Sequence, residues 1–419
     1  MAQYAVAHSP FFRRHYWDSD LRDFFSLPTV NKKIMMDQLT DYNTMGLTRE
    51  EILAFCLAVE NSRDFSRRYK GLNLGMSSGT SGNKGVEITT PNEESYMRAA
   101  FLARFPWQAA EKINAAFILR VSSPAFTLDR FGHKLTYISQ LTPLEIITSG
   151  LANLRPNVIA APPSTLKLIA REVEAGRLAV RLRRVVAFAE ILYPDVKDYL
   201  ARAFRCEVHE IYKCTEGPIA ISCKYGSLHI NEDLVLIETL NDDGTPTPPG
   251  EPCRRLIVTD LHKKSQPIIR YELNDILTIS PGACACGSSF RVIERIQGRA
   301  DDLFWSRDLE SGRWRAVFPD YISRAIITAS DDIEEYQATQ ISPGQVTVRI
   351  QLKSGVHPEA FDGEAVIRNI RKVFADHGCR APGVSIESGN PELSRGSGKL
   401  TRIRREFPFE DDIDAAREI

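Results

Sequence analysis

The chain lacks a surplus of charge of either sign: its 419 residues carry 53 basic and 54 acidic side chains, for a formal net charge of -1. Without a basic excess, nothing in the composition favours binding to nucleic acid. Long hydrophobic runs are also missing, because stretches such as residues 115–119 fall far short of the roughly 20 residues of a membrane-spanning helix. Residues 1–5 show no basic segment followed by an apolar run, so we expect no secretion signal and no membrane span.

Cysteine is scarce as well, with eight residues in the whole chain. Since no secretion signal is expected, the thiols are predicted to be reduced or to bind metal, as in a cytoplasmic protein. Hydrophobic residues make up 43% of the chain, which is enough for a large core, and the length favours two domains over one.

Hydrophobic spacing changes along the chain. The first 70 residues favour helices, since Ile52, Cys56 and Val59 recur on one helical face. Strand-like apolar runs then alternate with helix-like segments, and this alternation predicts an α/β sheet with helices on its faces. The runs are 117–121, 158–161 and 185–189, and the helical segments are 94–103, 164–175 and 194–204. Residues 219–279 favour strands, with a turn-forming cluster at 242–250.

A different and smaller unit is predicted beyond residues 298–302. Val346, Val348 and Ile350 alternate along one face of a strand. Residues 364–374 have the spacing of an amphipathic helix, and 384–387 that of another short strand. Such a segment, with a hydrophobic pattern of its own, can form a small α+β domain.

The sharpest chemical feature is a glycine- and hydroxyl-rich stretch at residues 77–85. Its glycines let the backbone turn tightly and present N–H groups, while its hydroxyls and one lysine add donors, which is the chemistry of a phosphate cradle. The spacing differs from the common G-x-x-x-x-G-K-[ST] nucleotide loop, since Gly85 follows the lysine. A flexible surface loop has the same composition.

Five motifs in order resemble the adenylate-forming superfamily. They span the chain from Ser77 to Arg402. They are Ser77-Ser78-Gly79-Thr80-Ser81-Gly82-Asn83-Lys84, Tyr212-Lys213-Cys214-Thr215-Glu216, the segment from Pro267 that ends in Asp275, Gly298-Arg299-Ala300-Asp301-Asp302, and Gly398-Lys399-Leu400-Thr401-Arg402. Within the superfamily, the chain resembles the branch of phenylacetate-CoA ligases and coenzyme F390 synthetase-like proteins, on the residues Leu228-His229-Ile230-Asn231-Glu232-Asp233, Cys284-Ala285-Cys286-Gly287 and His8-Ser9-Pro10-Phe11-Phe12.

The resemblance implies an architecture and a reaction. We expect a large N-terminal α/β domain at residues 1–297, a hinge at 298–302 with Asp301 as its pivot, and a small mobile α+β domain at 303–419. The active site would lie between the two domains. A carboxylic acid and ATP would give acyl-AMP and pyrophosphate. Because all the reacting groups are negative, catalysis must be mainly positioning and charge neutralisation.

The same resemblance implies a role for each matched residue. Lys399 would bridge the substrate carboxylate and the α-phosphate, Thr215 would bond the α-phosphate, and Glu216 would help to hold Mg²⁺, a cation that prefers oxygen ligands. Tyr212 would lie against adenine, and Asp275 would accept the ribose hydroxyls. The implied ATP-binding residues are Ser77, Ser78, Gly79, Thr80, Ser81, Gly82, Lys84, Ala189, Glu190, Tyr212, Asp275 and Arg299.

Each of these residues alone has an ordinary interpretation. Glu216 and Asp275 could be solvated loop acids, and Lys399 an exposed surface cation. Their common order supports the functional interpretation. The motif also departs from the usual pattern, because Lys213 stands where the tyrosine is normally followed by glycine, and Cys214 comes next. This departure concerns the contact with substrate or acceptor more than the nucleotide site.

A second site is predicted from cysteine and histidine. Cys223, His229, Cys284 and Cys286 offer three thiols and one imidazole, a donor set that suits a closed tetrahedral zinc site with a structural role. Free cysteines with a loop histidine are the alternative. The resemblance to relatives with cysteines in this region favours zinc. Cys56, Cys206, Cys253 and Cys379 are interpreted as structural.

The acyl acceptor stays open. CoA is favoured by the resemblance, an amine is the main alternative, and loading of a carrier protein is the third. A phosphotransferase would instead release ADP, and a non-catalytic nucleotide-binding regulator would need neither Glu216 nor Lys399. The acid itself is not identified by the sequence, although its pocket is expected to draw on residues 107–127 and 158–164.

Overall fold

The computed structural model describes residues 1–76, 85–105, 111–122, 128–130, 132–299, 302–393 and 400–407. Residues 77–84 of the predicted phosphate loop (77–85), the predicted pivot Asp301 and the predicted catalytic lysine Lys399 lie outside these residues. The described residues nearest to them are Met76 and Gly85, Arg299 and Asp302, and Leu393 and Leu400.

The chain begins with short helices, as its early hydrophobic spacing predicts. Pro10 starts one of them, and Thr48 with Glu51 forms a capping box at the start of the longest, which buries Ile52, Cys56 and Val59. The helices are α1 (Ala2–His8), α2 (Pro10–His15), the 3₁₀ helix η1 (Phe24–Ser26), α3 (Lys32–Asp37), α4 (Leu39–Tyr42) and α5 (Arg49–Ser62), and the β-hairpin that follows is β1 (Asn73–Met76) and β2 (Val86–Thr89).

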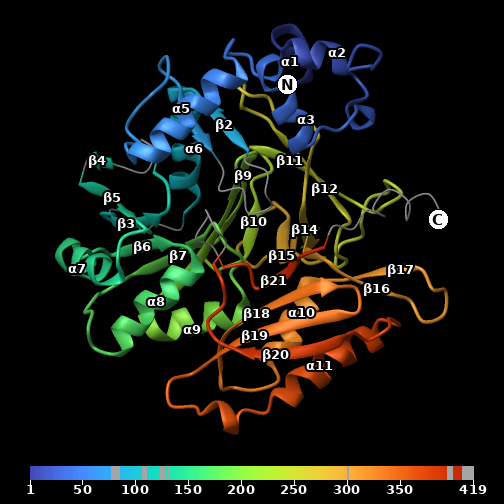
Figure 1. Cartoon of the computed structure of the whole chain (residues 1–419). Coiled ribbons are helices and arrows are strands. Elements are labelled where there is room, and N and C mark those ends of the chain that lie inside the picture. The colour runs from blue at the N-terminus through green and yellow to red at the C-terminus, as the bar shows by residue number, and fades with distance from the viewer. Residues whose placement is uncertain are drawn as a thin grey trace.

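A ten-stranded mixed sheet forms the centre of the molecule (Figure 1). The strand order is β14-β15-β10-β9-β8-β7-β6-β3-β5-β4, and the five strands from β8 to β5 are parallel. The strands are β3 (Asn114–Leu119), β4 (Leu128–Arg130), β5 (His133–Ser139), β6 (Val158–Ala161), β7 (Arg184–Phe188), β8 (Glu207–Cys214), β9 (Gly217–Ser222), β10 (Leu228–Ile230), β14 (Asp275–Ile279) and β15 (Val292–Arg299).

The central parallel strands β6 and β7 are buried on both faces, which is why their sequences are continuous apolar runs. On one face, Ile159, Ala161 and Val185 pack against α7 (Leu144–Leu154), α8 (Pro163–Glu174) and α9 (Pro194–Phe204). On the other, Val158, Ala160 and Phe188 pack with Phe101 and Leu102 of α6 (Pro91–Arg104). The predicted helices and strands are confirmed, with one shift: the strand predicted at 117–121 runs from Asn114 to Leu119.

The strand-rich segment predicted at 219–279 also contains a separate three-stranded antiparallel sheet. Its strands are β11 (Val235–Leu240), β12 (Arg255–Asp260) and β13 (Tyr271–Leu273). The turn cluster at 242–250 joins β11 to β12, as the Gly/Pro/Asp composition indicates.

The last part of the chain folds around a four-stranded sheet with its own core. Val346, Val348 and Ile350 face Val366, Ile370 and Phe374 of α11, so the predicted amphipathic pair is confirmed. Strand order is β20-β19-β18-β21. The elements are the hairpin β16 (Phe304–Arg307) and β17 (Trp314–Val317), α10 (Pro319–Ile327), β18 (Ile333–Ser342), β19 (Gln345–Leu352), the 3₁₀ helix η4 (Pro358–Ala360), α11 (Gly363–Asp376), β20 (Gly383–Ser388) and β21 (Ile403–Arg405).

A buried cluster of ion pairs joins this C-terminal unit to α8. The Glu335 carboxylate accepts hydrogen bonds from Lys167 Nζ and from Arg402 Nε, each at 2.6 Å, and the Arg402 guanidinium lies over the rings of Tyr193 and Tyr336. The side chains of Lys167, Glu335 and Arg402 are 12%, 11% and 6% exposed. The three charges are largely removed from water, so each is stabilised by the others. Removing one of them would leave a buried charge without its partner.

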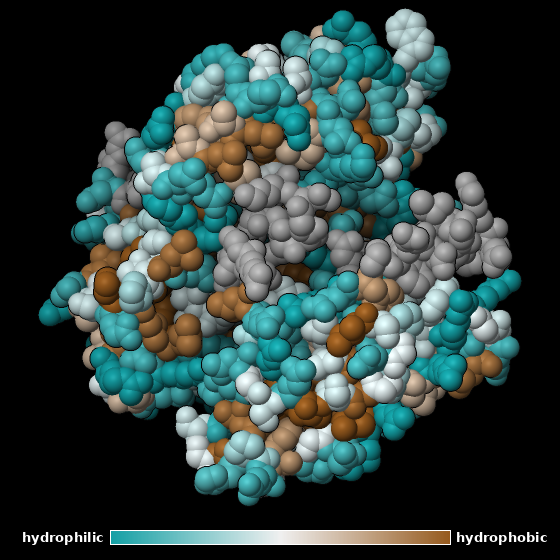
Figure 2. Space-filling view, in the orientation of Figure 1, coloured by the Kyte–Doolittle hydropathy of each residue, from teal (hydrophilic) through white to brown (hydrophobic). Residues whose placement is uncertain are grey.

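The surface carries no dominant apolar face in the view of Figure 2. Hydrophilic residues cover most of it, and hydrophobic ones form separate patches. Among the described helices, none is both long and apolar enough to cross a membrane.

Candidate active site and metal cluster

One large cavity, of about 1290 Å³, is lined by residues of four of the five superfamily motifs and by the two residues that precede the fifth. The C-terminal ends of β7 and β8, the strand β15 and the segment before β21 all line it. Its motif residues are Gly75 and Met76 before the glycine-rich loop, Ala189, Glu190, Tyr212, Thr215, Glu216, Asp275, Gly298, Arg299, Asp302, and Leu400, Thr401 and Arg402 after the C-terminal lysine. The carboxyl ends of parallel strands are the usual place for a ligand in an open α/β sheet.

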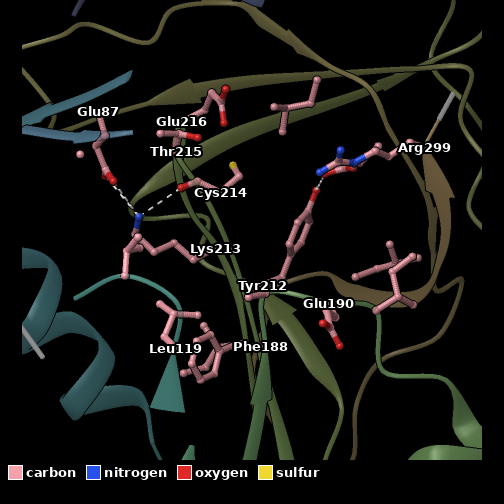
Figure 3. Close-up of a pocket in the computed structure, with 18 of the residues that line it drawn as sticks. Glu87, Leu119, Phe188, Glu190, Tyr212, Lys213, Cys214, Thr215, Glu216 and Arg299 are labelled. Carbon is pink, nitrogen blue, oxygen red and sulfur yellow. Dashed lines mark hydrogen bonds and ion pairs between the residues drawn. The ribbon is translucent and has the colours of Figure 1, made fainter. Parts of the chain in front are cut away.

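Tyr212 and Asp275 lie together in this cavity, although 63 positions separate them in the chain. The Tyr212 hydroxyl donates a hydrogen bond to the Asp275 carboxylate, and Arg299 Nε is 3.7 Å from the other carboxylate oxygen (Figure 3). Burial, together with the negative charge of Asp275, raises the pKa of Tyr212 well above its ordinary value, so its phenol remains a donor. An aromatic face and a carboxylate are thus presented side by side.

Thr215 and Glu216 lie at the turn between β8 and β9. Glu216 is buried, and the Lys263 ammonium holds the turn by donating to the Thr215 carbonyl at 3.2 Å. Figure 3 shows Thr215 and Glu216 on the same side of the cavity as Glu87, away from Arg299. A buried carboxylate next to a hydroxyl, both at a cavity wall, is a suitable place for a hard cation and a phosphate.

Ala189 and Glu190 follow the end of β7. Ala189 adopts a left-handed φ of 66°, a conformation that L-residues rarely take, and this turns the chain into the cavity. The Glu190 carboxylate accepts hydrogen bonds from the backbone N–H and the hydroxyl of Ser164, at 3.0 and 2.9 Å. It therefore satisfies one of the free N–H groups at the start of α8, in addition to lining the cavity.

Glu210 was missed by the sequence interpretation. It lies on β8 two residues before Tyr212 and therefore on the same face, and it lines the same cavity. Burial raises the pKa of Glu210 to about 7. Side chains alternate between the two faces of a strand, so counting back two residues from Tyr212 would have identified Glu210 as a residue on the same face.

Lys213 points to the opposite side of β8 from Tyr212. Its ammonium donates to both oxygens of Glu87 at 3.2 Å and to the Cys214 carbonyl at 3.3 Å. Glu87 lies on β2, the strand that begins just after the glycine-rich loop. The position at which the motif departs from its usual glycine is thus occupied by an ion pair at the cavity wall.

Gly298, the first residue of the predicted hinge, adopts a backbone conformation that favours glycine. Its φ is 131°, and a Cβ at this position would lie 3.1 Å from Pro319 Cγ. A larger residue would therefore be strained at this φ and would require a small shift of Pro319.

Residues from both segments that were expected to form the acid pocket line the cavity. Phe117, Leu119, Val121 and Ser122 line it from the first expected segment, and Pro163 and Ser164 from the second. Residues 107–110 and 123–127 lie outside the described parts of the chain.

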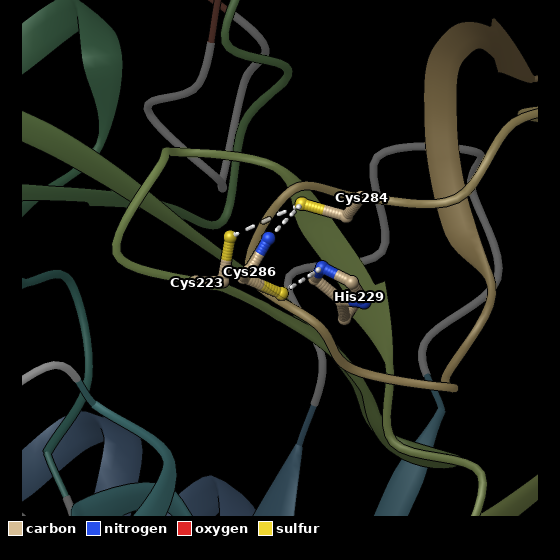
Figure 4. A group of neighbouring side chains, drawn as sticks. All are labelled: Cys223, His229, Cys284 and Cys286. Atoms are coloured by element: carbon tan, nitrogen blue, oxygen red, sulfur yellow. Dashed lines mark hydrogen bonds between the residues drawn. The ribbon is translucent and has the colours of Figure 1, made fainter.

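The four predicted zinc ligands lie together, away from this cavity (Figure 4). The ligand atoms of Cys223, His229, Cys284 and Cys286 all lie within 4.8 Å of one another. Cys223 and Cys284 are 3.8 Å apart at their sulfurs, and Cys286 Sγ is 3.3 Å from His229 Nε2. Hydrogen bonds from Ser227 and from the Cys286 N–H lower the pKa of Cys284 to about 6.

The other cysteines fit their structural interpretation. Cys56, Cys253 and Cys379 are buried, and Cys206 is half-buried against the helical face of the sheet. Burial raises the pKa of Cys56 to about 12 and that of Cys206 to about 11, so both remain thiols.

Comparison with known proteins gives relatives in one superfamily. No family model matches the chain. The chain is 27% identical over 243 residues to the phenylacetate-coenzyme A ligase of Thermus thermophilus, covering 55% of this chain and 52% of that protein, and 28% identical over 205 residues to that of Escherichia coli, covering 48% and 39%. The chain spans about half the length of the curated relatives it matches.

Solved structures match over the whole chain. The 2-hydroxyisobutyryl-CoA ligase in its postadenylation state, in complex with R3-HIB-AMP, matches with a TM-score of 0.73 at 18% identity, covering 100% of this chain and 89% of that one. The same ligase in the thioesterification state matches with a TM-score of 0.54 at 17% identity, over 97% and 87%.

Fold and sequence together indicate the class: the chain is similar to enzymes of the adenylate-forming superfamily. Within that superfamily it is a distant homologue of the phenylacetate-CoA ligases, which confirms the resemblance found in the motifs.

Proposed function

We propose that the protein activates a carboxylic acid with ATP as acyl-AMP and then transfers the acyl group, with CoA as the first candidate acceptor. The observation that carries this proposal is that four of the five motifs, together with Gly75 and Met76 just before the fifth, line one cavity, although these residues span more than 300 positions of sequence. Chance placement of unrelated surface loops would scatter them over the molecule.

The nucleotide is assigned to the part of the cavity around Tyr212. Its ring would lie against adenine, next to the turn at Ala189 and Glu190, and Asp275 would accept the ribose hydroxyls with Arg299 beside it. The Asp275 carboxylate accepts the hydrogen bond of the Tyr212 hydroxyl and faces Arg299, so it is oriented before any ligand arrives.

The phosphates are assigned to the other side. Ser77, Ser78, Gly79, Thr80, Ser81, Gly82 and Lys84 would hold the β- and γ-phosphates, and β1 and β2 bring both ends of this loop to the cavity. Thr215 would bond the α-phosphate, and Glu216 fits Mg²⁺ because it is a buried carboxylate at the wall. Mg²⁺, when bound, would neutralise phosphate charge.

The second unit would deliver Lys399. Its neighbour Leu400 lines the cavity, as do Thr401 and Arg402. We assign the large domain to residues 1–297, the hinge to 298–302 with Asp301 as pivot, and the small mobile domain to 303–419, with the active site between them. The better match to the postadenylation state than to the thioesterification state of one ligase supports two arrangements of the small domain, of which this chain resembles the first.

The motifs indicate the nucleotide more narrowly than they indicate the acyl acceptor. CoA is favoured because the curated relatives matched at 24–28% identity include three phenylacetate-coenzyme A ligases. An amine and a carrier protein remain the alternatives, and the same cavity could serve any of them after acyl-AMP has formed.

The cluster of Cys223, His229, Cys284 and Cys286 fits one structural Zn²⁺. His229 Nδ1 is 2.9 Å from the Phe290 carbonyl, which leaves Nε2 to face Cys286 and fixes the ring as a ligand. Zinc in this position would tie the loop at 284–286 to β10 and to the end of β9. With four protein ligands, no open position would remain for catalysis.

A panel of carboxylic acids scored by acid-dependent pyrophosphate exchange tests the first half-reaction. An acceptor panel of CoA, amines and carrier protein, run with the best acid, tests the second. Release of ADP instead of pyrophosphate would identify a phosphotransferase, and nucleotide binding without turnover of any acid would favour a regulator.

A further inference from the structure

The apolar end of the cavity contains a charged pair. Side chains from α6, β3 and β7 form its wall, namely Met97, Phe101, Leu102, Phe117, Leu119 and Phe188. Lys213 reaches this wall from β8 and meets Glu87 from β2, with Leu119 and Phe188 on its other side (Figure 3). Placing an ammonium next to aromatic and aliphatic side chains costs free energy, so a compensating interaction is expected.

Two cations share the Glu87 carboxylate, because a second ammonium, that of Lys263, lies 3.7 Å from it. Burial opposes the charge of Lys213, but the attraction of Glu87 outweighs it and raises the pKa of Lys213. Burial likewise opposes the charge of Glu87, and the two lysines outweigh it and lower the pKa of Glu87. Glu216 also attracts Lys213, and Asp260 interacts with Lys263, so further carboxylates help to hold the two cations in place.

Stability alone does not account for this arrangement. Apolar residues of similar volume usually stabilise a protein as well as a buried ion pair does. Lys213 has three donors, and among the described residues its recorded acceptors are the Glu87 carboxylate and the Cys214 carbonyl. Its side chain is still 25% exposed, and it lines the cavity. Glu87 therefore holds a charged donor at the cavity wall, where the acceptor of a ligand could replace one of these three bonds, all of 3.2–3.3 Å.

A second cation faces the same cavity from α6. Arg98 lines it one turn after Glu94, and the buried Arg98 Nε has no hydrogen-bond partner within the described part of the chain. A ligand with a polar group in this region could satisfy it.

We propose that Lys213 is a specificity-determining residue, and that the preferred acid carries, beyond the reacting carboxyl, a second hydrogen-bond acceptor such as a hydroxyl or a carboxylate. The proposal rests on the proposed function in one respect, since it takes the apolar end of the cavity as the acyl subsite. Apolar walls bind the body of the acid, and Lys213 binds its acceptor.

The test measures binding separately from catalysis. The probes are acylsulfamoyl adenosines, which are stable mimics of acyl-AMP, made in matched pairs from phenylacetate and 4-hydroxyphenylacetate, and from hexanoate and adipate. Calorimetry gives Kd for each probe with the wild-type protein, with Lys213→Met and with Lys263→Met. Lys263→Met is the matched control because it also removes a lysine from Glu87, yet Lys263 does not line the cavity.

We expect the wild-type protein to bind the acceptor-bearing member of at least one pair about 10- to 100-fold more tightly, as is typical of a hydrogen bond to a charged group. Lys213→Met should abolish that preference, while Lys263→Met should keep the ratio even if it weakens all probes. Comparing the hydroxyl with the carboxylate probe shows whether the acceptor is neutral or anionic.

Equal binding within both pairs by the wild-type protein would overturn the proposal. So would a Lys213→Met protein that weakens both members of a pair by the same factor, because the lysine would then only hold β8 to β2. Pyrophosphate exchange run alongside keeps the two hypotheses apart. If the protein prefers the acceptor-bearing probe but shows no pyrophosphate exchange, adenylation is rejected and the Lys213 subsite is retained. If it shows pyrophosphate exchange but no preference between the probes, adenylation is retained and the Lys213 subsite is rejected.

Discussion

Glu335 is the side chain on which the contact between the C-terminal unit and α8 depends, and its charge can be removed with little change of shape. In Glu335→Gln, Lys167 and Arg402 would face a neutral amide instead of a carboxylate at 2.6 Å. Both cations are nearly removed from water, with 12% and 6% of their side chains exposed. Breaking a buried pair in this way typically costs about 3–5 kcal/mol. A typical free energy of unfolding is about 5–15 kcal/mol, so the loss would be large.

Urea unfolding followed by tryptophan fluorescence and by circular dichroism measures this loss. Two of the four tryptophans, Trp305 and Trp314, lie in the C-terminal unit, so part of the fluorescence signal reports on it. The matched control is Asp376→Asn, which removes an exposed pair with Lys372 whose side chains are 71% and 55% exposed. That pair should contribute no more than about 0.5 kcal/mol.

The pH dependence gives an independent check. Burial opposes the charge of Glu335, but Arg402 and Lys167 outweigh it and lower its pKa. A carboxyl with a lowered folded pKa contributes stability that is present above the unfolded value, about 4.3 for glutamate, and is lost as the pH falls through the folded value. The difference between wild type and Glu335→Gln should therefore be full at pH 7 and should shrink in acid. If the variant were as stable as Asp376→Asn at pH 7, the buried cluster would not stabilise the contact.

Three further predictions test the other assignments. Lys399→Ala should lower acyl-AMP formation by about 10²–10³-fold while ATP binding survives, and adenylation at the wild-type rate would reject the assignment of this lysine. Purified protein should contain about one zinc per chain, and Cys286→Ser should lower zinc content and thermal stability more than it lowers adenylation by the folded fraction; metal-free protein on elemental analysis would contradict this. Asp301→Pro, which restrains φ near about -65°, should reduce acyl transfer much more than pyrophosphate exchange, and equal losses in both assays would argue against rotation about this residue.

The elements of the fold were largely predictable because their signals are local. Val346, Val348 and Ile350 alternate, and 364–374 repeats every third and fourth residue, so each segment shows which side it buries before any partner is known. The ends of strands were less accurate, as for the strand predicted at 117–121. Ala189 likewise takes a left-handed turn just outside β7, although nothing in an alanine indicates it. The pairing order of the ten strands has no local signal at all.

What the sequence by itself indicated was the kind of chemistry: the ordered motifs indicated the superfamily and the residues that we propose bind ATP, and four cysteine and histidine positions indicated the proposed metal donor set. Only the tertiary structure decided which side chains act together. It brought Glu87 and Lys213, 126 positions apart, to the same wall, and it joined Lys167 to Glu335 and Arg402 across two units. It also placed Glu210 beside Tyr212 in the cavity and raised its pKa to about 7. The physical reason is that residue type and spacing are local properties, whereas burial and the distance between charges depend on how remote segments pack.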